Sequence, residues 1–432
     1  MVELAETHLK LKTIDRSFHK IKPDFSRSSG CLLFDTNTQM HYMDLFGMYS
    51  SLALGYNHPI YNSEHFKKAV MDAVTVKITH NEMKSMPYDL FLDAFSQFAN
   101  ADQLFSHIQL TCTGSLAVEV AIKIAYVGIC GTDMHVYFGH MDKRVGFERI
   151  IGHEMSGYVH QVGSKVKDFQ VGQPVVVRPL DHCGECPACK SRYNHICHNL
   201  KFLGLDTDGA LQEIWNVPSH TLHHLPEKLR MDYAALIEPV AVACHDVRLS
   251  RLKKDEDVLV IGGGPIGVLV AMVARDSGAR VIISEVNSFR LKIAQKLGFD
   301  TINPKEINLI EEINKKTNHK GADVVFEVSG SQTGVDVMTD CAATRGRIVM
   351  VAIHAEKPVV DMFRFFWREL ELIGVRVYEK EDYEKAIKIL ESGGIDADTI
   401  ITDVSDLKEV QNAFNSLSNS PTALKSLIKV GD

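Results

Sequence analysis

The chain has 432 residues, of which 45% are hydrophobic and 24% are charged, and its formal net charge is −8. This length predicts about two or three domains, and the composition is that of a globular protein. The acidic balance argues against a dedicated nucleic-acid binder, because it leaves no basic stripe to displace counterions from phosphates. Chemistry on a small molecule is the better hypothesis.

The N-terminal residues, MVELAETHLKLKTIDR, alternate charged with single apolar residues and lack the apolar core of a secretory signal. The most membrane-like run, residues 258–274, is interrupted by three consecutive glycines and a proline. It is also shorter than the roughly 20 apolar residues that a spanning helix needs. We therefore expect a cytoplasmic protein with no membrane segment.

Residues 1–125 precede every metal-ligand motif in the chain. Apolar alternation predicts short strands over 32–34 and 41–46, and helical periodicity begins at Ser63 and covers 85–100. The run TCTGSLAVEVAIKIA at 111–125 passes from an apolar strand into a helix opened by Gly114 and Ser115. Such a helix start suits a phosphate, although an ordinary helix cap is the more frequent explanation of the pattern.

Two stretches of this segment resemble class III, pyridoxal-phosphate-dependent aminotransferases, and among them lysine ε-aminotransferases: FDTNTQMHYMDLFGMYSSLALGYNHP and TGSLAVEVAIKIA. The resemblance implies that Gly114 and Ser115 contact the cofactor phosphate. It ends before the family's Schiff-base lysine and pyridine-binding aspartate. Without that lysine no covalent aldimine forms, so we expect a fragment with no catalysis of its own.

A catalytic metal site is predicted where this fragment ends. Cys130 offers a thiolate, and Thr132 and His135 follow it at spacings of two and five, which suits a hydroxyl-to-imidazole proton relay. His153 and Glu154, in IIGHEMSG, add an imidazole and a carboxylate, both of which are zinc ligands. A His-Glu pair alone is a weak signal, but its combination with Cys130 predicts a catalytic zinc.

The region around these residues has the β-branched alternation of small antiparallel strands, in YVHQVGSKV and QPVVVRP. Glu238 lies farther on, in the apolar run LIEPVAVACH, where a buried acid needs a partner. We expect it to be either the fourth zinc ligand or a contact of the zinc-bound water.

A second metal site is predicted from four cysteines with the spacing C-x2-C-x2-C-x7-C. Four thiolates close a tetrahedral shell, so this zinc is structural rather than reactive. A disulfide pair or a redox dithiol is the alternative explanation. His195 and His198 flank the last cysteine and could compete as ligands. The predicted ligands are Cys183, Cys186, Cys189 and Cys197.

A dinucleotide-binding domain is predicted over residues 243–378. A β-rich strand at 257–261 runs into G-x-G-x-x-G and the helical run VLVAMVARDSG. Glu285 ends the next strand, 21 positions past Gly264, where it would accept hydrogen bonds from the adenosine ribose. A carboxylate there favours NAD over NADP, Arg290 could reverse that preference, and a solvated strand-end acid is the alternative for Glu285. The predicted cofactor contacts in the loop are Gly262, Gly264, Pro265, Ile266 and Gly267.

Further strands, ADVVFEVSG and GRIVMVAI, extend the parallel sheet. Their C-terminal ends, at Val328, Val351 and Ile353, should face the nicotinamide. The run KEDYEKAIKILESGG has helical spacing, and TIITDV and SLIKV are predicted strands that return to the first barrel.

Residues 126–432 resemble zinc-dependent medium-chain dehydrogenase/reductases, in the neighbourhood of sorbitol, threonine and butanediol dehydrogenases. The resemblance is carried by GICGTD, GHEMSG, the four-cysteine loop, IEPVAVACH and GGGPIG. It implies an α/β protein with a Rossmann domain and a GroES-like β-barrel catalytic domain, one catalytic and one structural zinc, NAD as cofactor, and a dimer or tetramer. The implied reaction is oxidation of a secondary alcohol such as a polyol, a diol or a threonine-like substrate.

The expected domains are 1–125, 126–242, 243–378 and a returning segment, 379–432. The barrel's first strands are absent from the sequence, and their loss should leave open sheet edges and exposed core. If the barrel forms, residues 121–127 should be a strand. A non-enzymatic chimeric fusion that binds NAD and structural zinc is therefore the alternative to an active alcohol dehydrogenase, and the missing lysine disfavours a bifunctional enzyme.

Overall fold

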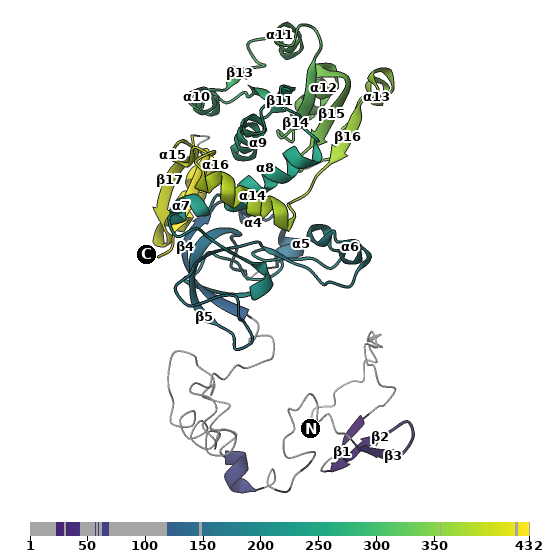
Figure 1. The fold of residues 1–432 in the computed structure, drawn as a ribbon. Coiled ribbons are helices and arrows are strands. Elements are labelled where there is room, and N and C mark those ends of the chain that lie inside the picture. Colours follow the sequence, from purple (N-terminus) through teal and green to yellow (C-terminus); the bar gives the residue numbers. More distant parts are fainter. Residues whose placement is uncertain are drawn as a thin grey trace, which may run out of the picture. The chain divides into compact units, whose positions relative to one another are not determined.

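The computed structural model describes residues 23–29, 32–43, 57, 59, 63–68, 119–146, 149–354, 356–419 and 422–431 (Figure 1). The chain divides into two compact units, 1–110 and 111–432. No helix among the described residues is long and apolar enough to cross a bilayer.

The first unit contains a three-stranded antiparallel sheet of β1 (Pro23–Ser29), β2 (Leu32–Asp35) and β3 (Met40–Met43). The strand predicted over 32–34 is confirmed, and the one over 41–46 is confirmed as far as Met43. A helical turn follows Ser63. The remaining residues of that second strand, the helix expected over 85–100, and Gly114 with Ser115 all lie outside the described residues.

Strand β4 (Glu119–Gly128) is the first described element of the second unit and leads directly to Cys130. The helix predicted to run through 125 is wrong for its described part, which is a strand. The reason is a two-residue period: Val120, Ile122 and Ile124 are buried, whereas Lys123 between them is exposed. The strand expected over 121–127 is confirmed, and it runs across the predicted domain boundary at 125.

A seven-stranded sheet surrounds β4 in the order β10-β6-β5-β4-β18-β17, with β9 also paired to β4. Strand β5 lies along one side of β4, while β9 and β18 share the other side. The other strands of this sheet are β5 (Glu154–Val162), β6 (Pro174–Val177), β9 (Ile214–Pro218), β10 (Leu222–His224), β17 (Ile401–Asp406) and β18 (Lys425–Lys429).

The expectation of an exposed core is wrong for this strand. Val120, Ile122, Ile124 and Val127 are each at most 1% exposed. Both hydrogen-bonding sides of β4 are occupied, and the C-terminal strand β18 provides half of one of them. The predicted return of the C-terminal strands to the barrel is therefore confirmed, because β18 pairs with β4, and the yellow C-terminal strands lie beside β4 in Figure 1.

A six-stranded parallel sheet forms the nucleotide domain, in the order β13-β12-β11-β14-β15-β16. Side chains of β11 alternate between two cores: Val258 and Val260 pack on one face, and Leu259 and Ile261 on the other. This burial on both faces explains the continuous apolar strands. The strands are β11 (Asp257–Ile261), β12 (Arg280–Ser284), β13 (Asp300–Ile302), β14 (Ala322–Glu327), β15 (Ala342–Met350) and β16 (Glu371–Gly374).

Helices cover these sheets and connect their strands. In the nucleotide domain they are α9 (Pro265–Asp276), α10 (Ser288–Lys296), α11 (Leu309–Lys316), α12 (Gln332–Cys341) and α13 (Met362–Arg368). The others are α4 (Gly131–Tyr137), α5 (Asp142–Val145), α6 (Pro187–Lys190), α7 (Met231–Ala234), α8 (Ile237–Leu249), α14 (Lys380–Glu391), α15 (Ala397–Ile400) and α16 (Val410–Asn419). A short hairpin of β7 (Leu180–Asp181) and β8 (Lys201–Phe202) flanks the four-cysteine loop.

Candidate active site

Three predicted ligands meet at the end of β4. The ligand atoms of Cys130, His153 and Glu154 all lie within 4.8 Å of one another. Cys130 caps α4, while His153 and Glu154 lie at the start of β5, whose first residue pairs with Gly128 of β4. Antiparallel pairing thus brings together residues more than twenty positions apart in the sequence.

The donor set fits a zinc ion. A thiolate, an imidazole and a carboxylate are all zinc ligands, and three protein ligands leave a coordination position open. A Cβ at Gly128 would overlap with the carboxylate of Glu154, so glycine there leaves room for the ligand. Both His153 and Glu154 are at most 2% exposed.

Asp133 orients the histidine. Its carboxylate lies 3.4 Å from Nδ1 of His153, and its other oxygen accepts a hydrogen bond from the backbone N–H of Cys130 at 2.9 Å. Burial acts to lower the pKa of His153, but the charge of Asp133 raises it well above its ordinary value. A proton held on Nδ1 leaves Nε2 free for a metal.

Lys425 of β18 forms a buried ion pair with Glu154 and donates a hydrogen bond to the carbonyl oxygen of Ile129 at 3.1 Å. The side chain of Lys425 is 3% exposed. Burial acts to lower its pKa, but Glu154, Cys130 and Glu238 raise it above its ordinary value. Lys425 therefore supplies a positive charge beside three acidic side chains, those of Cys130, Glu154 and Glu238.

Glu238 lies in the first turn of α8 and is 5% exposed. One of its oxygens accepts a hydrogen bond from the hydroxyl of Tyr378 at 2.8 Å. Burial raises the pKa of Glu238 to about 7, and His153 and Glu154 are among the charges that act on it. The charges of His153 and Glu154 thus act on Glu238, but its oxygens are not among the ligand atoms that lie within 4.8 Å of one another. Its two predicted roles stay predictions.

The two residues of the predicted proton relay lie one turn apart on α4. Thr132 is half-buried, and His135 is exposed. The His135 ring lies beside that of His140, with 3.3 Å between their Nδ1 atoms. Thr132 lies near the N-terminal end of α4, beside Cys130, and His135 lies farther along the helix toward solvent. No hydrogen bond joins Thr132 to His135 within this described helix.

The four cysteines of the second site form a closed cluster. Their sulfur atoms lie within 4.8 Å of one another, with 3.4 Å between Cys197 and Cys183 and 3.8 Å between Cys186 and Cys197. A tetrahedron with Zn–S bonds of about 2.3 Å has edges of roughly 3.8 Å, so the separations fit zinc. All seven cysteines of the described residues are free thiols.

Backbone amides stabilise the thiolates. The N–H groups of Glu185 and Cys186 lower the pKa of Cys183 to about 6, whereas burial raises the pKa of Cys189 to about 12. The backbone N–H of His198 donates to Cys186 Sγ at 3.4 Å, so His198 contributes its amide. His195 instead points its Nδ1 toward Glu379 at 3.6 Å.

The glycine loop joins β11 to α9 as predicted. Gly262 has φ +105, where a side chain would meet the backbone of Ser329, and a Cβ at Gly267 would overlap with the carbonyl oxygen of Gly262. Gly264 caps α9, and Pro265 and Ile266 form its first turn. These features let a pyrophosphate approach the helix N-terminus.

Glu285 is 6% exposed, and its carboxylate accepts hydrogen bonds from the backbone N–H groups of Gly263, Val286 and Asn287 at 2.6–2.8 Å. The solvated strand-end alternative is therefore wrong. Arg290 lies beside the loop, with one guanidinium nitrogen 3.6 Å from the position of a Cβ on Gly264, and its buried Nε has no hydrogen-bond partner.

The residues predicted to face the nicotinamide follow β14 and β15. The backbone N–H of Val328 donates to Ile261, and that of Val351 donates to Glu327, both at 2.9 Å. Val328 and Val351 are half-buried, whereas Ile353 is 83% exposed. All three lie at the C-terminal edge of the parallel sheet, where the glycine loop also lies.

A third group of possible ligands, at His245, Glu379 and Asp382, was not anticipated from the sequence. The guanidinium of Arg248 lies among them, donating to Asp382 at 2.7 Å and pairing with Glu379, while His245 Nδ1 is 2.8 Å from Asp382. The Arg248 guanidinium therefore takes the place that a metal ion would have, and these residues form an ion-pair network that links α8 to α14.

Sequence reasoning missed Asp133, Tyr378 and Lys425. Asp133 stands inside GICGTD and had a local signal, because an acid three residues after a helix cap can bond back to it. Tyr378 and Lys425 had no local signal: they lie 140 and 296 residues from Glu238 and Ile129, their respective hydrogen-bond partners.

Comparison with known families matches three parts of the chain. The model described as alcohol dehydrogenase GroES-like domain matches residues 117–227, and that of zinc-binding dehydrogenase matches 265–392. The model of class-III aminotransferases matches 13–133. The aminotransferase and GroES-like matches overlap in β4 and the metal-ligand turn.

Individual proteins extend this similarity. A 2-dehydro-3-deoxy-L-galactonate 5-dehydrogenase of Pseudoalteromonas atlantica is 51% identical over 313 residues, covering 72% of this chain and 92% of its own. The structure of 2R,3R-butanediol dehydrogenase from Bacillus subtilis superposes with a TM-score of 0.67 at 28% identity, covering 76% of this chain and 96% of its own. A zinc-binding dehydrogenase structure from Sinorhizobium meliloti, bound to NADP, gives a TM-score of 0.69 at 29% identity, with coverage of 75% and 94%.

Proposed function

This chain belongs to the zinc-dependent medium-chain dehydrogenase/reductases, and on that premise we propose that it oxidises a secondary alcohol to a ketone with NAD as the hydride acceptor. The observation that carries the proposal is the meeting of Cys130, His153 and Glu154 within 4.8 Å, next to the buried Glu238. In the proposal these three residues hold the catalytic zinc, and the four-cysteine cluster holds a structural zinc.

The reaction removes a proton and a hydride from the alcohol. When bound, zinc supplies Lewis-acid polarisation of the hydroxyl group, and the nicotinamide supplies the hydride acceptor. Thr132 and the exposed His135 pass the hydroxyl proton along α4 to solvent. Asp133 holds His153 in its ligating orientation, and Lys425 offsets the negative charge of the ligand set.

The substrate class follows from the relative with 51% identity, whose name describes oxidation at carbon 5 of a deoxy keto sugar acid. We infer that the substrate here is a hydroxylated acid or polyol with a secondary alcohol.

NAD is the preferred cofactor in this proposal. Glu285 directly follows β12 and accepts hydrogen bonds from three backbone N–H groups, and a carboxylate there repels a 2′-phosphate. Arg290 beside Gly264 is the residue that could instead favour NADP. The ratio of turnover with NAD and NADP, for the wild type and for Glu285→Gln, measures the preference.

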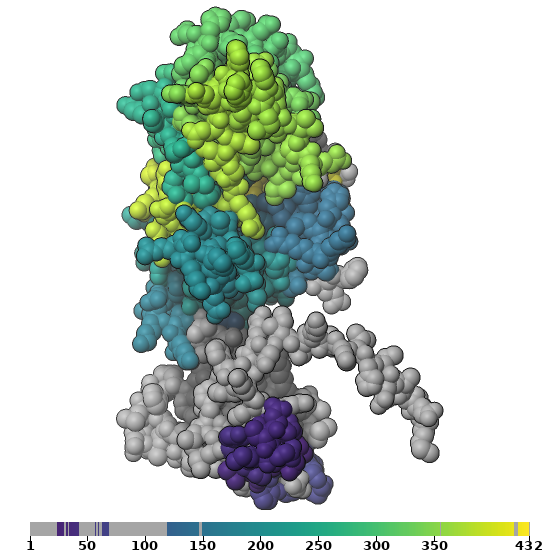
Figure 2. Space-filling model, turned by 90° about the vertical axis from the view of Figure 1, so that its right-hand side faces the viewer, coloured from purple at the N-terminus to yellow at the C-terminus, as the bar shows by residue number. Residues whose placement is uncertain are grey.

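We further propose that the enzyme is a homo-oligomer in a reducing, cytoplasmic setting. Helix α13 carries four large apolar side chains that are 63–76% exposed, and β16 beside it ends the parallel sheet. This helix lies on the side turned to the viewer in Figure 2, where yellow-green atoms form the surface. Apolar surface of this kind usually marks an association site, and light scattering of Phe366→Glu tests it. The residues are Met362, Phe363, Phe366 and Trp367.

One experiment tests the central proposal. Purified full-length protein is analysed for zinc per chain, and NADH formation is followed with sorbitol, butanediol, threonine and a 2-dehydro-3-deoxy sugar acid. Two zinc ions with turnover on a secondary alcohol support it. One zinc with no turnover on any of these alcohols contradicts it and leaves a protein that binds only structural zinc.

A further inference from the structure

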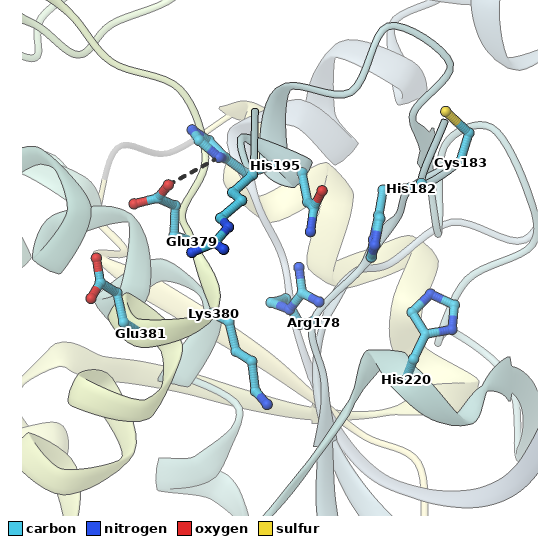
Figure 3. A pocket seen from close by; sticks show the side chains of 11 residues that line it. Arg178, His182, Cys183, His195, His220, Glu379, Lys380 and Glu381 are labelled. Carbon is cyan, nitrogen blue, oxygen red and sulfur yellow. Dashed lines mark ion pairs between the residues drawn. The ribbon is translucent and has the colours of Figure 1, made fainter. Parts of the chain in front are cut away.

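A cavity of about 680 Å³ lies between the four-cysteine loop and the N-terminal end of α14 (Figure 3). None of its lining residues belongs to the candidate catalytic centre or to the glycine loop, although Cys183 forms part of the wall. Its walls are rich in basic and imidazole side chains. These are Arg178, His182, Arg192, His195, His220 and Lys380.

Arg178 is the unusual member of this wall. It follows β6 directly and is only 5% exposed. Its Nε has no hydrogen-bond partner, and no ion pair forms to its guanidinium in the described part of the chain. Figure 3 shows this guanidinium pointing into the cavity. Burial lowers the pKa of Arg178. A buried charge without a counter-ion is costly, so this arginine needs an anion.

The acids of the wall do not meet that need. Glu379 and Glu381 both pair with Arg248, on the outer side of the α8–α14 network. Arg192 also lacks an ion pair among the described residues, and Lys380 has only a distant one, 3.8 Å from Glu384. Among the arginine, lysine and carboxylate side chains of the wall, positive charge therefore exceeds negative charge.

Neutral donors complete the arrangement. The Nδ1 atoms of His182 and His195 are buried without hydrogen-bond partners, although His195 also faces the carboxylate of Glu379 at 3.6 Å. An arginine can hold two oxygens of a phosphate or a carboxylate at once, and imidazole N–H groups can donate to the remaining oxygens. The cavity volume is in the range of small-metabolite sites.

We propose that this cavity binds a small oxyanion, namely the phosphate or carboxylate group of a metabolite, with Arg178 as its anchor. Such an anion would contact residues of the four-cysteine loop and of the start of α14 at the same time. The site is separate from the residues of the proposed hydride transfer, so the inference goes beyond the proposed function.

The test uses the zinc-loaded full chain and thermal unfolding at constant ionic strength. Inorganic phosphate and malonate, compared with chloride, serve as the phosphate and carboxylate probes. We expect either or both oxyanions to raise the Tm by about 3 °C or more at saturation, because the ligand binds only the folded state. The probe that gives the larger shift identifies the chemical source of the anion.

Arg178→Gln is expected to abolish this shift. Without oxyanion it should be at least as stable as the wild type, because it removes an uncompensated buried charge. Arg345→Gln is the matched control, since its side chain is 77% exposed outside the cavity and its loss changes net charge equally. That control should keep the full shift.

Lys380→Gln keeps the proposal testable if the first variant does not fold. Lys380 is 72% exposed, so its replacement should preserve the fold and weaken oxyanion binding several-fold by titration calorimetry. The proposal is overturned if neither oxyanion shifts the wild type, if Arg178→Gln keeps the shift, or if Lys380→Gln binds with unchanged affinity.

Discussion

The two candidate metal centres of this protein are built in opposite ways. The four-cysteine cluster draws all its ligands from one loop, Cys183 to Cys197, and its thiolates accept hydrogen bonds from amides of the same loop. The candidate catalytic centre gathers groups from five segments, from Cys130 at the N-cap of α4 to Lys425 on β18. The first needs only local chain geometry, whereas the second exists only if the barrel closes.

Cys130→Ser should have the largest effect on activity. Loss of the thiolate removes a ligand from the open centre but leaves the four-cysteine loop intact, so zinc should fall from two to one per chain. We expect kcat/KM to fall at least about 1,000-fold. Cys341→Ala, which removes a buried thiol of α12, serves as the control and should keep both zinc ions. Unchanged activity of Cys130→Ser would refute the ligand assignment.

Cys197→Ser should affect stability more than chemistry. The closed cluster would lose its zinc, and we expect a decrease in Tm of about 10 °C, because metal binding contributes directly to folding of such a loop. Turnover per correctly folded chain should decrease less than tenfold. Retention of two zinc ions by this variant, measured by elemental analysis, would rule out the four-thiolate site.

Lys425→Met tests the residue that only the tertiary structure brings to the centre. It leaves Glu154 buried without its cationic partner, and we expect kcat/KM or zinc affinity to fall about 10- to 100-fold. Lys425→Arg should retain most of the wild-type activity and zinc affinity. Lys408→Met, on an exposed turn, should change neither. Equal activity of Lys425→Met and wild type would mean that the ion pair has no role.

Asp382→Asn should have the smallest effect and a dependence on pH. Burial acts to raise the pKa of Asp382, but Arg248 and His245 lower it below the ordinary value of 3.8. A depressed carboxyl pKa stabilises the fold above pH 3.8, and this contribution is lost as the pH falls through the folded-state pKa. We therefore expect a Tm decrease of about 4 °C at pH 7 that narrows below about pH 4.

Glu381→Gln is the matched control for this variant. Glu381 also pairs with Arg248, at 3.1 Å, but its side chain is 64% exposed. Solvent-exposed pairs contribute little, so its Tm should change by less than about 1 °C. If the Tm of Asp382→Asn stays below that of the wild type by the same amount down to acidic pH, lost packing rather than lost charge is the cause.

Much of the fold could be predicted from local pattern. The strand–glycine–helix unit at Gly262 to Gly267 was predictable because each glycine answers a steric demand within a few residues. The four-cysteine site was predictable because all four ligands lie within one short stretch of sequence, at a spacing typical of zinc sites. The prediction of a helix through Ala125 was wrong because TGSLAVEVAIKIA lies where the aminotransferase and GroES-like matches overlap, and the two families differ in the structure that they imply there. The burial of every second residue of β4 shows that the described part is a strand.

The sequence by itself determined the zinc and dinucleotide motifs, since ligand spacing and glycine positions act over short distances. Only the tertiary structure decided that β18 completes the side of β4, that Lys425 and Tyr378 reach the catalytic centre, and that Arg178 lines a cavity without a counter-ion. These contacts join residues separated by long stretches of chain. Their formation depends on sheet pairing and burial, which no local spacing records.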